Sequence, residues 1–246
     1  MWALFGKYRK LILFGLILLS SGVYLWVRVG DKTAVNLDAV GNPKWFNFQN
    51  KLTIEQSLHI PKITCLSDKD NDGVNDLEDI INGAKAEVNR MPQYRSAYYQ
   101  GGFPPETEGV CTDVVWRALG DAGYDLKALV DKDIRENPSK YPRVAGHADP
   151  NIDFRRVPNL IVFLRRYGTE LTKDIKPGDV ENLYQWQAGD IVTYDYPHEH
   201  IAIVSDKRRK DGVPFILHNA GPTASERDQL ESWPSEITGH FRFPKF

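Results

Sequence analysis

Residues 111–123 read CTDVVWRALGDAG, and this stretch decides the fold that we predict for the chain. Its apolar residues recur at the spacing of one helical face, and Gly123 ends the run with a residue that favours helix termination. These apolar residues are Val114, Val115, Ala118, Leu119 and Ala122. The stretch therefore predicts an amphipathic helix that begins near Cys111 and buries one face against a core.

Short runs typical of β-strands follow this helix along the chain. Residues 159–168, NLIVFLRRYG, are compatible with a second helix. Turn formers such as KDG separate the strand-like runs, which are DIVTY (190–194), HIAIVS (200–205), PFILHN (214–219) and HFRF (240–243). A helix followed by antiparallel strands predicts an α+β domain over residues 91–246, with the helix of Cys111 packed on the sheet.

Three residues of this domain form a candidate catalytic set. A thiol at the amino terminus of a helix, as predicted for Cys111, lies near the positive end of the helix dipole, which favours the thiolate. His200 opens an apolar strand, where a rigid sheet can hold an imidazole as the base. His218, on the next strand, can orient that imidazole, and Asn219 is the alternative orienting residue on the opposite strand face. Taken singly, each residue also fits an ordinary buried position.

The first thirty residues predict a membrane anchor. Residues 11–27, LILFGLILLSSGVYLWV, carry no charge, and as a helix they would reach about 25 Å, slightly less than a typical hydrocarbon core. Lys7, Arg9 and Lys10 precede this segment and favour a cytoplasmic amino terminus, which would leave the rest of the chain outside the membrane. A cleaved signal peptide is the alternative, although no clear cleavage site follows.

The overall charge argues against a nucleic-acid partner. The chain has a net charge of −2, and its first thirty residues hold basic side chains but no acid, so the remainder is more acidic still. Binding to a phosphate backbone calls for a basic face.

An acidic segment before the catalytic domain predicts a calcium site. Residues 68–79, DKDNDGVNDLED, match the twelve-residue EF-hand loop, with Gly73 at the position of the sharp turn. The expected ligands are Asp68, Asp70, Asp72, the carbonyl of Val74, Asp76 and Asp79. Position twelve of the loop holds aspartate rather than the usual glutamate. The alternative to a calcium site is a solvated acidic turn that binds no metal. We expect a structural calcium ion and no organic cofactor.

Two further features leave alternatives open. Cys65 and Cys111 are the two cysteines of the chain, and a disulfide between them competes with two separate thiols, which their different settings favour. Arg155 and Arg156 lie in a polar cluster that could bind a substrate carboxylate, or could form a structural ion-pair network with nearby acids.

The motifs in combination resemble known families. YYQGGFPPETEGVC at 98–111, with the Gly-Asp and histidine-bearing strands, is similar to NlpC/P60 peptidases of the papain-like superfamily. The range 65–246 resembles the DUF1287 family more closely. This resemblance implies a papain-like fold, Cys111 as nucleophile, His200 as base, His218 as orienting residue and Tyr98 near the oxyanion site. The residues around the nucleophile are Val-Cys-Thr-Asp rather than the usual Asp-Cys-Ser-Gly.

Together these features predict an extracytoplasmic cysteine hydrolase of amide bonds, with peptidoglycan stem peptides as the expected substrate. A thiol acyltransferase with the same residues and a non-catalytic, calcium-braced wall-binding module are the alternatives. We divide the chain into a cytoplasmic stub and anchor (1–28), a stalk (29–60), a calcium loop with its helix (61–90) and a catalytic domain (91–246). The sequence predicts no oligomeric state.

Overall fold

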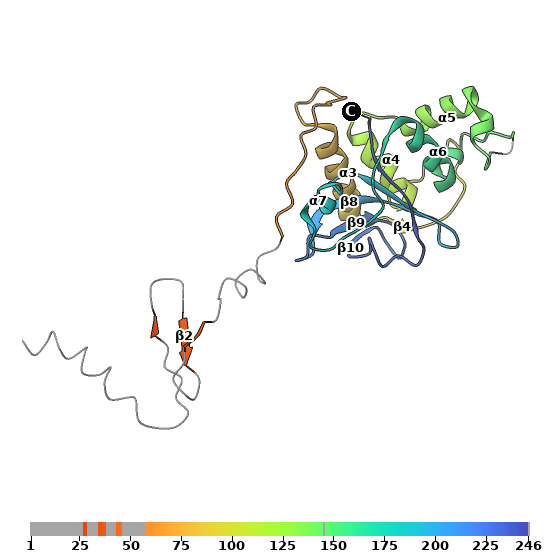
Figure 1. Ribbon diagram of the computed structural model, residues 1–246. Coiled ribbons are helices and arrows are strands. Elements are labelled where there is room, and N and C mark those ends of the chain that lie inside the picture. The colour runs from red at the N-terminus through yellow and green to blue at the C-terminus, as the bar shows by residue number, and fades with distance from the viewer. Residues whose placement is uncertain (1–26, 29–33, 38–42, 46–57, 145, 246) are drawn as a thin grey trace, which may run out of the picture. The chain divides into compact units, whose positions relative to one another are not determined.

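The computed structural model describes residues 27–28, 34–37, 43–45, 58–144 and 146–245 (Figure 1). The chain divides into two units, Met1–Gln56 and Ser57–Phe246. In the first unit the described residues form an antiparallel three-stranded sheet of β1 (Val27–Arg28), β2 (Ala34–Leu37) and β3 (Pro43–Trp45).

The predicted membrane segment, residues 11–27, and most of the predicted stalk lie outside the described residues; Val27, the last residue of that segment, belongs to β1. Within the described ranges, no helix has the length and apolar character needed to cross a bilayer.

The second unit is an α+β domain, which confirms the predicted class. Its helices are α3 (Asp76–Arg90), α4 (Cys111–Asp121), α5 (Leu126–Glu136), α6 (Val157–Tyr167) and α7 (Val180–Tyr184), with short 3-10 turns at Pro138–Lys140 and Asp153–Arg155. Its main sheet holds β6 (Thr169–Glu170), β7 (Ile191–Tyr194), β8 (His200–Arg208), β9 (Pro214–His218), β10 (Ser225–Arg227) and β11 (Ile237–Arg242). The strand order is β10-β9-β8-β7-β11-β6, and all neighbours are antiparallel, as the sequence predicts.

A second, parallel pair of short strands lies near the beginning of α4. These strands are β4 (Gln93–Tyr94) and β5 (Glu108–Gly109). β4 follows α3 and β5 precedes α4, so their pairing places the segment before Cys111 next to the segment after α3.

Helices α3 and α4 cover one face of the main sheet, whereas Leu183 of α7 lies in the core on the other face. Figure 1 shows α3 and α4 side by side against β8 and β9, in agreement with their tertiary contacts. On this face Ile201, Ile203 and Leu217 pack against Val114, Val115, Ala118 and Leu119 of α4. Strand alternation sends Ala202, Val204 and Ile216 to the other face, where they join a second core with Trp186 and Tyr194. The predicted apolar stripe of α4 is therefore the part of the helix that is buried.

Close approach of α3 and α4 depends on a glycine in α3. A Cβ atom built on Gly83 would lie 3.0 Å from the Cα of Ala118 and 2.9 Å from the Cβ of Asp121. The small residue therefore lets the two helix backbones meet at short distance, which holds the α4 helix against its neighbour.

We predict opposite effects for two glycine-to-alanine substitutions in this helix pair. Gly83→Ala should lower the free energy of unfolding by about 1–2 kcal/mol, because overpacking outweighs the gain in helix propensity. Gly120→Ala, in the exposed part of α4 where an added Cβ would meet nothing within 4 Å, should raise it by about 0.5–1 kcal/mol. Urea unfolding followed by tryptophan fluorescence measures both, and equal shifts for the two variants would contradict this account of the packing.

Candidate active site

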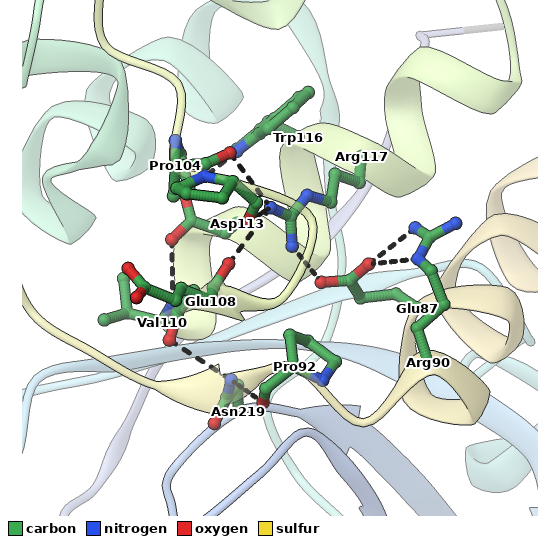
Figure 2. A network of polar contacts seen from close by, with 12 residues as sticks. Glu87, Arg90, Pro92, Pro104, Glu108, Val110, Asp113, Trp116, Arg117 and Asn219 are labelled. Carbon is green, nitrogen blue, oxygen red and sulfur yellow. Dashed lines mark hydrogen bonds and ion pairs between the residues drawn. The ribbon is translucent and has the colours of Figure 1, made fainter. Parts of the chain in front are cut away.

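The start of α4 is held by one buried carboxylate, that of Asp113. Cys111 is the first residue of the helix, and Val110 before it is extended. Asp113 Oδ2 accepts a 2.7 Å hydrogen bond from the Val110 backbone N–H, and Oδ1 accepts a 2.9 Å bond from the indole N–H of Trp116. Figure 2 shows these contacts around the first turn. The third helical residue thus accepts a hydrogen bond from the backbone N–H of the residue before the helix, which is one half of a capping box, whereas Val110 has no side-chain acceptor for the other half.

Arg155 completes the partners of Asp113. Its Nε donates to Oδ1 at 2.7 Å and its Nη2 donates to Oδ2 at 2.8 Å, which is the paired geometry expected of arginine and carboxylate. Both side chains are buried, and Arg155 Nη1 also donates to the backbone carbonyl of Ala97. The pair therefore ties the helix of Cys111 to the 3-10 turn at Asp153–Arg155.

A second buried pair fixes the approach to the helix. Arg117 of α4 donates to the carboxylate of Glu87 in α3, and its Nη2 donates to the carbonyls of Pro105 and Glu108, each at 3.0 Å (Figure 2). Arg90 donates to the other oxygen of Glu87. The glycine-rich approach that the sequence places before Cys111 is thus fastened to both α3 and α4.

The two predicted histidines meet directly. His200 opens β8 and His218 ends β9, and His200 Nε2 lies 2.8 Å from His218 Nδ1. The strand register pairs Ile203 with Leu217, so the two histidines are diagonal neighbours on one sheet face. β8 and β9 therefore form the hairpin that the contact between the two histidines requires.

Asn219, the alternative orienting residue, has other partners. Its amide Nδ2 donates to the carbonyls of Pro92 at 3.1 Å and Gly109 at 3.2 Å (Figure 2). Its Oδ1 accepts a hydrogen bond from the backbone N–H of Gly221. It joins the end of β9 to β4 and β5. The contact with the imidazole of His200 therefore belongs to His218.

An indole covers the histidine pair. Trp233 stacks on His200 with a centroid distance of 4.0 Å and an interplanar angle of 15°, and its Nε1 donates to the carbonyl of His198. Burial lowers the pKa of His200 to about 3, and the nearby His218 adds to this shift. Burial also lowers the pKa of His218 to about 4, with Arg227 adding to the effect. Both imidazoles are therefore neutral at pH 7.

The thiol of Cys111 lies beside the start of β8. Its neighbours include the backbone N–H of Ile201, the residue after His200, and its side chain packs against the core between the helices and the sheet. Burial raises the pKa of the Cys111 thiol to about 11, and the charge of Asp113 adds to the rise, whereas the N–H groups of Ile201 and Thr112 lower it by less. The N–H group of Thr112 in the first helical turn thus favours the thiolate, as the helix position predicts, but burial outweighs it.

The thiol and the imidazole belong to opposite sides of the sheet. Cys111 packs with the cluster that includes Ile201, whereas His200 contacts Tyr194 and Trp233 of the other cluster. Among the hydrogen bonds of the described residues, none joins Cys111 to His200. They approach each other at the beginning of β8, where the thiol meets the backbone next to His200.

Other predicted site residues lie apart from the thiol. Tyr98 is 57% exposed, and its hydroxyl accepts from Asn151 at 2.7 Å and donates to Asp149 at 3.3 Å. Arg155 is committed to Asp113, and Arg156 pairs with Asp153 at 2.9 Å. Both arginines therefore form ion pairs within the chain, which was the alternative to binding a substrate carboxylate. Cys65 and Cys111 are separate free thiols.

Several residues of the site were not singled out from the sequence. Burial raises the pKa of the Tyr94 hydroxyl, and a thiolate at Cys111 would raise it further. Tyr94 therefore lies near the thiol. Trp233 comes from a loop with no periodic pattern, so no sequence signal marks it. Asp113 carried a usable signal, because an acid at the third position of a helix is typical of amino-terminal capping.

The acidic loop brings three of its predicted ligands together. Asp68, Asp70 and Asp72 each offer an oxygen within 4.8 Å of the others, and their charges, after burial, raise the pKa of Asp79 to about 6. Asp76 is turned away from them: its oxygens accept hydrogen bonds from Ser67, Tyr124 and the backbone N–H of Lys69. The structure therefore does not place Asp76 in the ligand set.

Comparison with known proteins gives a family without a stated activity. Residues 81–243 match a family model described as "Domain of unknown function (DUF1287)". A relative from Escherichia coli (strain K12), described as "Uncharacterized protein YijF", is 38% identical over 172 residues, which cover 67% of this chain and 80% of the relative. No solved structure matches. The matched range includes Cys111, His200 and His218, and it begins after the acidic loop.

The Asp113–Arg155 pair should dominate the stability of the site. Arg155→Met leaves a buried carboxylate without its cation and should lower the free energy of unfolding by about 3–5 kcal/mol. Lys132→Met, which removes an exposed pair with Glu136, should cost less than about 1 kcal/mol. Urea unfolding measures both, and an Arg155→Met variant as stable as the Lys132→Met control would refute the role of the pair.

The buried histidines should make the folded chain sensitive to acid. Their folded pKa values lie below the ordinary value of about 6.5, so the unfolded state takes up protons first and stability is lost as the pH falls below about 6.5. Each histidine should contribute a loss on the order of 2 kcal/mol by pH 4.5.

Urea unfolding at pH 7.5 and pH 4.5 tests this prediction. His200→Gln should show a smaller loss of stability between the two pH values than the parent chain, whereas His59→Gln, at an exposed position, should show the same loss. An equal loss in the parent and in His200→Gln would count against a neutral, buried His200.

Proposed function

Because the chain belongs to the DUF1287 family, whose description states no activity, we propose a function from the site itself: an extracytoplasmic cysteine hydrolase that cleaves amide bonds. The observation that carries this proposal is the 2.8 Å contact between His200 and His218 at the start of β8, next to the backbone group that touches the thiol of Cys111. A helix-borne thiol, a strand-borne imidazole and a second group that orients the imidazole are the parts of an activated nucleophile.

The proposed reaction begins from neutral groups. His200 accepts the thiol proton as the sulfur of Cys111 attacks the amide carbonyl, and the C–N bond breaks as His200 returns that proton to the leaving amine. Water, deprotonated by His200, then hydrolyses the thioester and restores the thiol. His218 holds the imidazole of His200 in position throughout.

Because Cys111 is protonated and His200 is neutral, the proton transfer must accompany the attack. The wide gap between the two pKa values opposes this transfer in the free chain, so the proposal requires that substrate binding bring the two values closer together. The imidazole must reach the thiol across the beginning of β8. Catalytic hydrogen bonds are often long in free enzymes and shorten in the substrate complex.

The oxyanion site would draw on two nearby donors. The backbone N–H of Cys111 lies in the first turn of α4, where N–H groups have no partner within the helix. The second donor would be the hydroxyl of Tyr94, because a charge on Cys111 raises the pKa of Tyr94 and the two side chains are therefore close. The predicted donor, Tyr98, instead contacts Asn151.

The substrate follows from the proposed location. Residues 11–27 would anchor the chain with its catalytic domain outside the cytoplasm, and the motifs resemble those of NlpC/P60 peptidases. Peptidoglycan stem peptides are the amide-rich material that such an enzyme would meet. Fold alone does not set the bond that is cleaved, so this part of the proposal rests on resemblance and location.

A second candidate function is a non-catalytic wall-binding module. The burial that raises the thiol pKa, together with the opposite packing of Cys111 and His200, favours it. The two candidates differ in what Cys111 does in the presence of peptidoglycan.

We predict Cys111-dependent release of amines from peptidoglycan. The purified full-length chain, in detergent micelles, should release new amino groups from solubilised fragments, as followed by mass spectrometry. Cys111→Ala should reduce the rate by about 1,000-fold or more. Cys65→Ala, which removes the other free thiol, should retain the parent rate.

The product distinguishes the candidates. Cross-linked peptides in place of free amines would identify acyl transfer to an amine. Binding of the fragments with no product in the parent chain would support the wall-binding module and overturn the hydrolase.

A further inference from the structure

The loop before α3 gathers carboxylates without any matching cation. Asp68, Asp70 and Asp72 present oxygens that all lie within 4.8 Å of one another. Gly73 has a φ of +95°, which permits the sharp turn between the third of these acids and the start of the helix. Among the ion pairs of the described residues, none involves these acids.

A fourth carboxylate, that of Asp79, points to a ligand. Asp79 is 9% exposed, and its Oδ2 is buried with no hydrogen-bond partner among the described residues. Burial raises the pKa of Asp79, and the charges of Asp72, Asp70 and Asp68 add to this rise, so these carboxylates lie close to it. A buried carboxylate costs free energy unless a donor or a cation compensates it, and here the nearest charged groups repel it.

We propose that residues 68–79 bind one calcium ion through Asp68, Asp70, Asp72, the carbonyl of Val74 and the buried carboxylate of Asp79. Calcium is a hard cation that takes six to eight oxygen ligands in flexible geometry, and this loop offers oxygens at the first, third, fifth, seventh and twelfth positions. Water would complete the shell. The site does not depend on the proposed hydrolase activity.

The ion would join two helices of the core. Asp79 lies in the first turn of α3, whereas the loop itself packs on the end of α4, since a Cβ added to Gly123 would lie 3.0 Å from the Cβ of Asp70. Tyr124, which follows Gly123, donates to Asp76 at the beginning of α3. Calcium would therefore stabilise the docking of α3 on α4, the helix that begins at Cys111.

Calorimetry on the full-length chain tests the site directly. After treatment with EDTA and removal of the chelator, titration with calcium chloride should show one ion bound per chain. The Tm in calcium at about 100 times the Kd should exceed the Tm in EDTA by about 5 °C or more. Magnesium chloride should give a weaker response, because magnesium demands near-ideal octahedral geometry.

Two variants that each remove one negative charge distinguish specific binding at this site from a general electrostatic effect on calcium. Asp79→Asn should weaken calcium binding at least tenfold, while its Tm in EDTA should equal or exceed that of the parent, because an uncompensated buried charge is lost. Glu78→Gln, at the exposed neighbouring position, should bind calcium as the parent does.

Three results would overturn the proposal: no heat of binding and no change in Tm with calcium, equal weakening in both variants, or calcium binding by Asp79→Asn that matches the parent. Should Asp79→Asn fail to fold, Asp72→Asn, at an exposed position of the loop, serves in its place with the same expected loss of binding. Activity is not the readout, so failure of the calcium site and failure of the hydrolase are distinguishable.

Discussion

The carboxylate of Asp113 is the constraint on which the rest of the candidate site depends. It accepts hydrogen bonds from the backbone of Val110, the indole of Trp116 and two nitrogens of Arg155, so it fixes both the beginning of α4 and the segment packed against it. Cys111 has its position because this helix starts where it does. Burial is the main cause of the raised pKa of the thiol, and the charge of Asp113 adds to it.

Burial shapes the electrostatics of both halves of the site. It raises the pKa of Cys111 to about 11 and lowers the pKa of His200 to about 3, so both groups are neutral at pH 7, on opposite sides of the sheet near the beginning of β8. Trp233 adds to the burial of His200 by stacking on its ring. Neutral partners avoid the cost of a permanent buried ion pair and place the formation of charge in the reaction itself.

The periodic parts of the fold were predictable because burial of one face leaves a repeating pattern in the sequence. The helix that begins at Cys111 and the strands at 190–194 and 200–205 follow from such patterns, although β8 continues to Arg208 beyond the predicted run. The contact of His218 with His200 followed from two adjacent strands forming a hairpin.

Contacts between segments distant in sequence were not predictable, because no local pattern encodes them. Arg155 lies 42 residues from Asp113, and from the sequence alone its choice between a substrate and a buried partner was open. Trp233 comes from a loop and Tyr94 from the two-residue strand β4, and neither segment is long enough or regular enough to leave a periodic pattern. The net pKa of the thiol was not predictable for a related reason: helix position is visible in the sequence, whereas the burial that outweighs its effect depends on the tertiary fold.

The most direct test of the central claim is the rate at which iodoacetamide labels Cys111 as a function of pH, measured in a Cys65→Ala background with His200 present or replaced by Gln. If His200 acts as the base, the replacement lowers the rate at pH 7.5 at least tenfold, and the difference narrows as the pH approaches about 11, where the thiolate forms without assistance. Equal rates with and without His200 across this range would contradict the account.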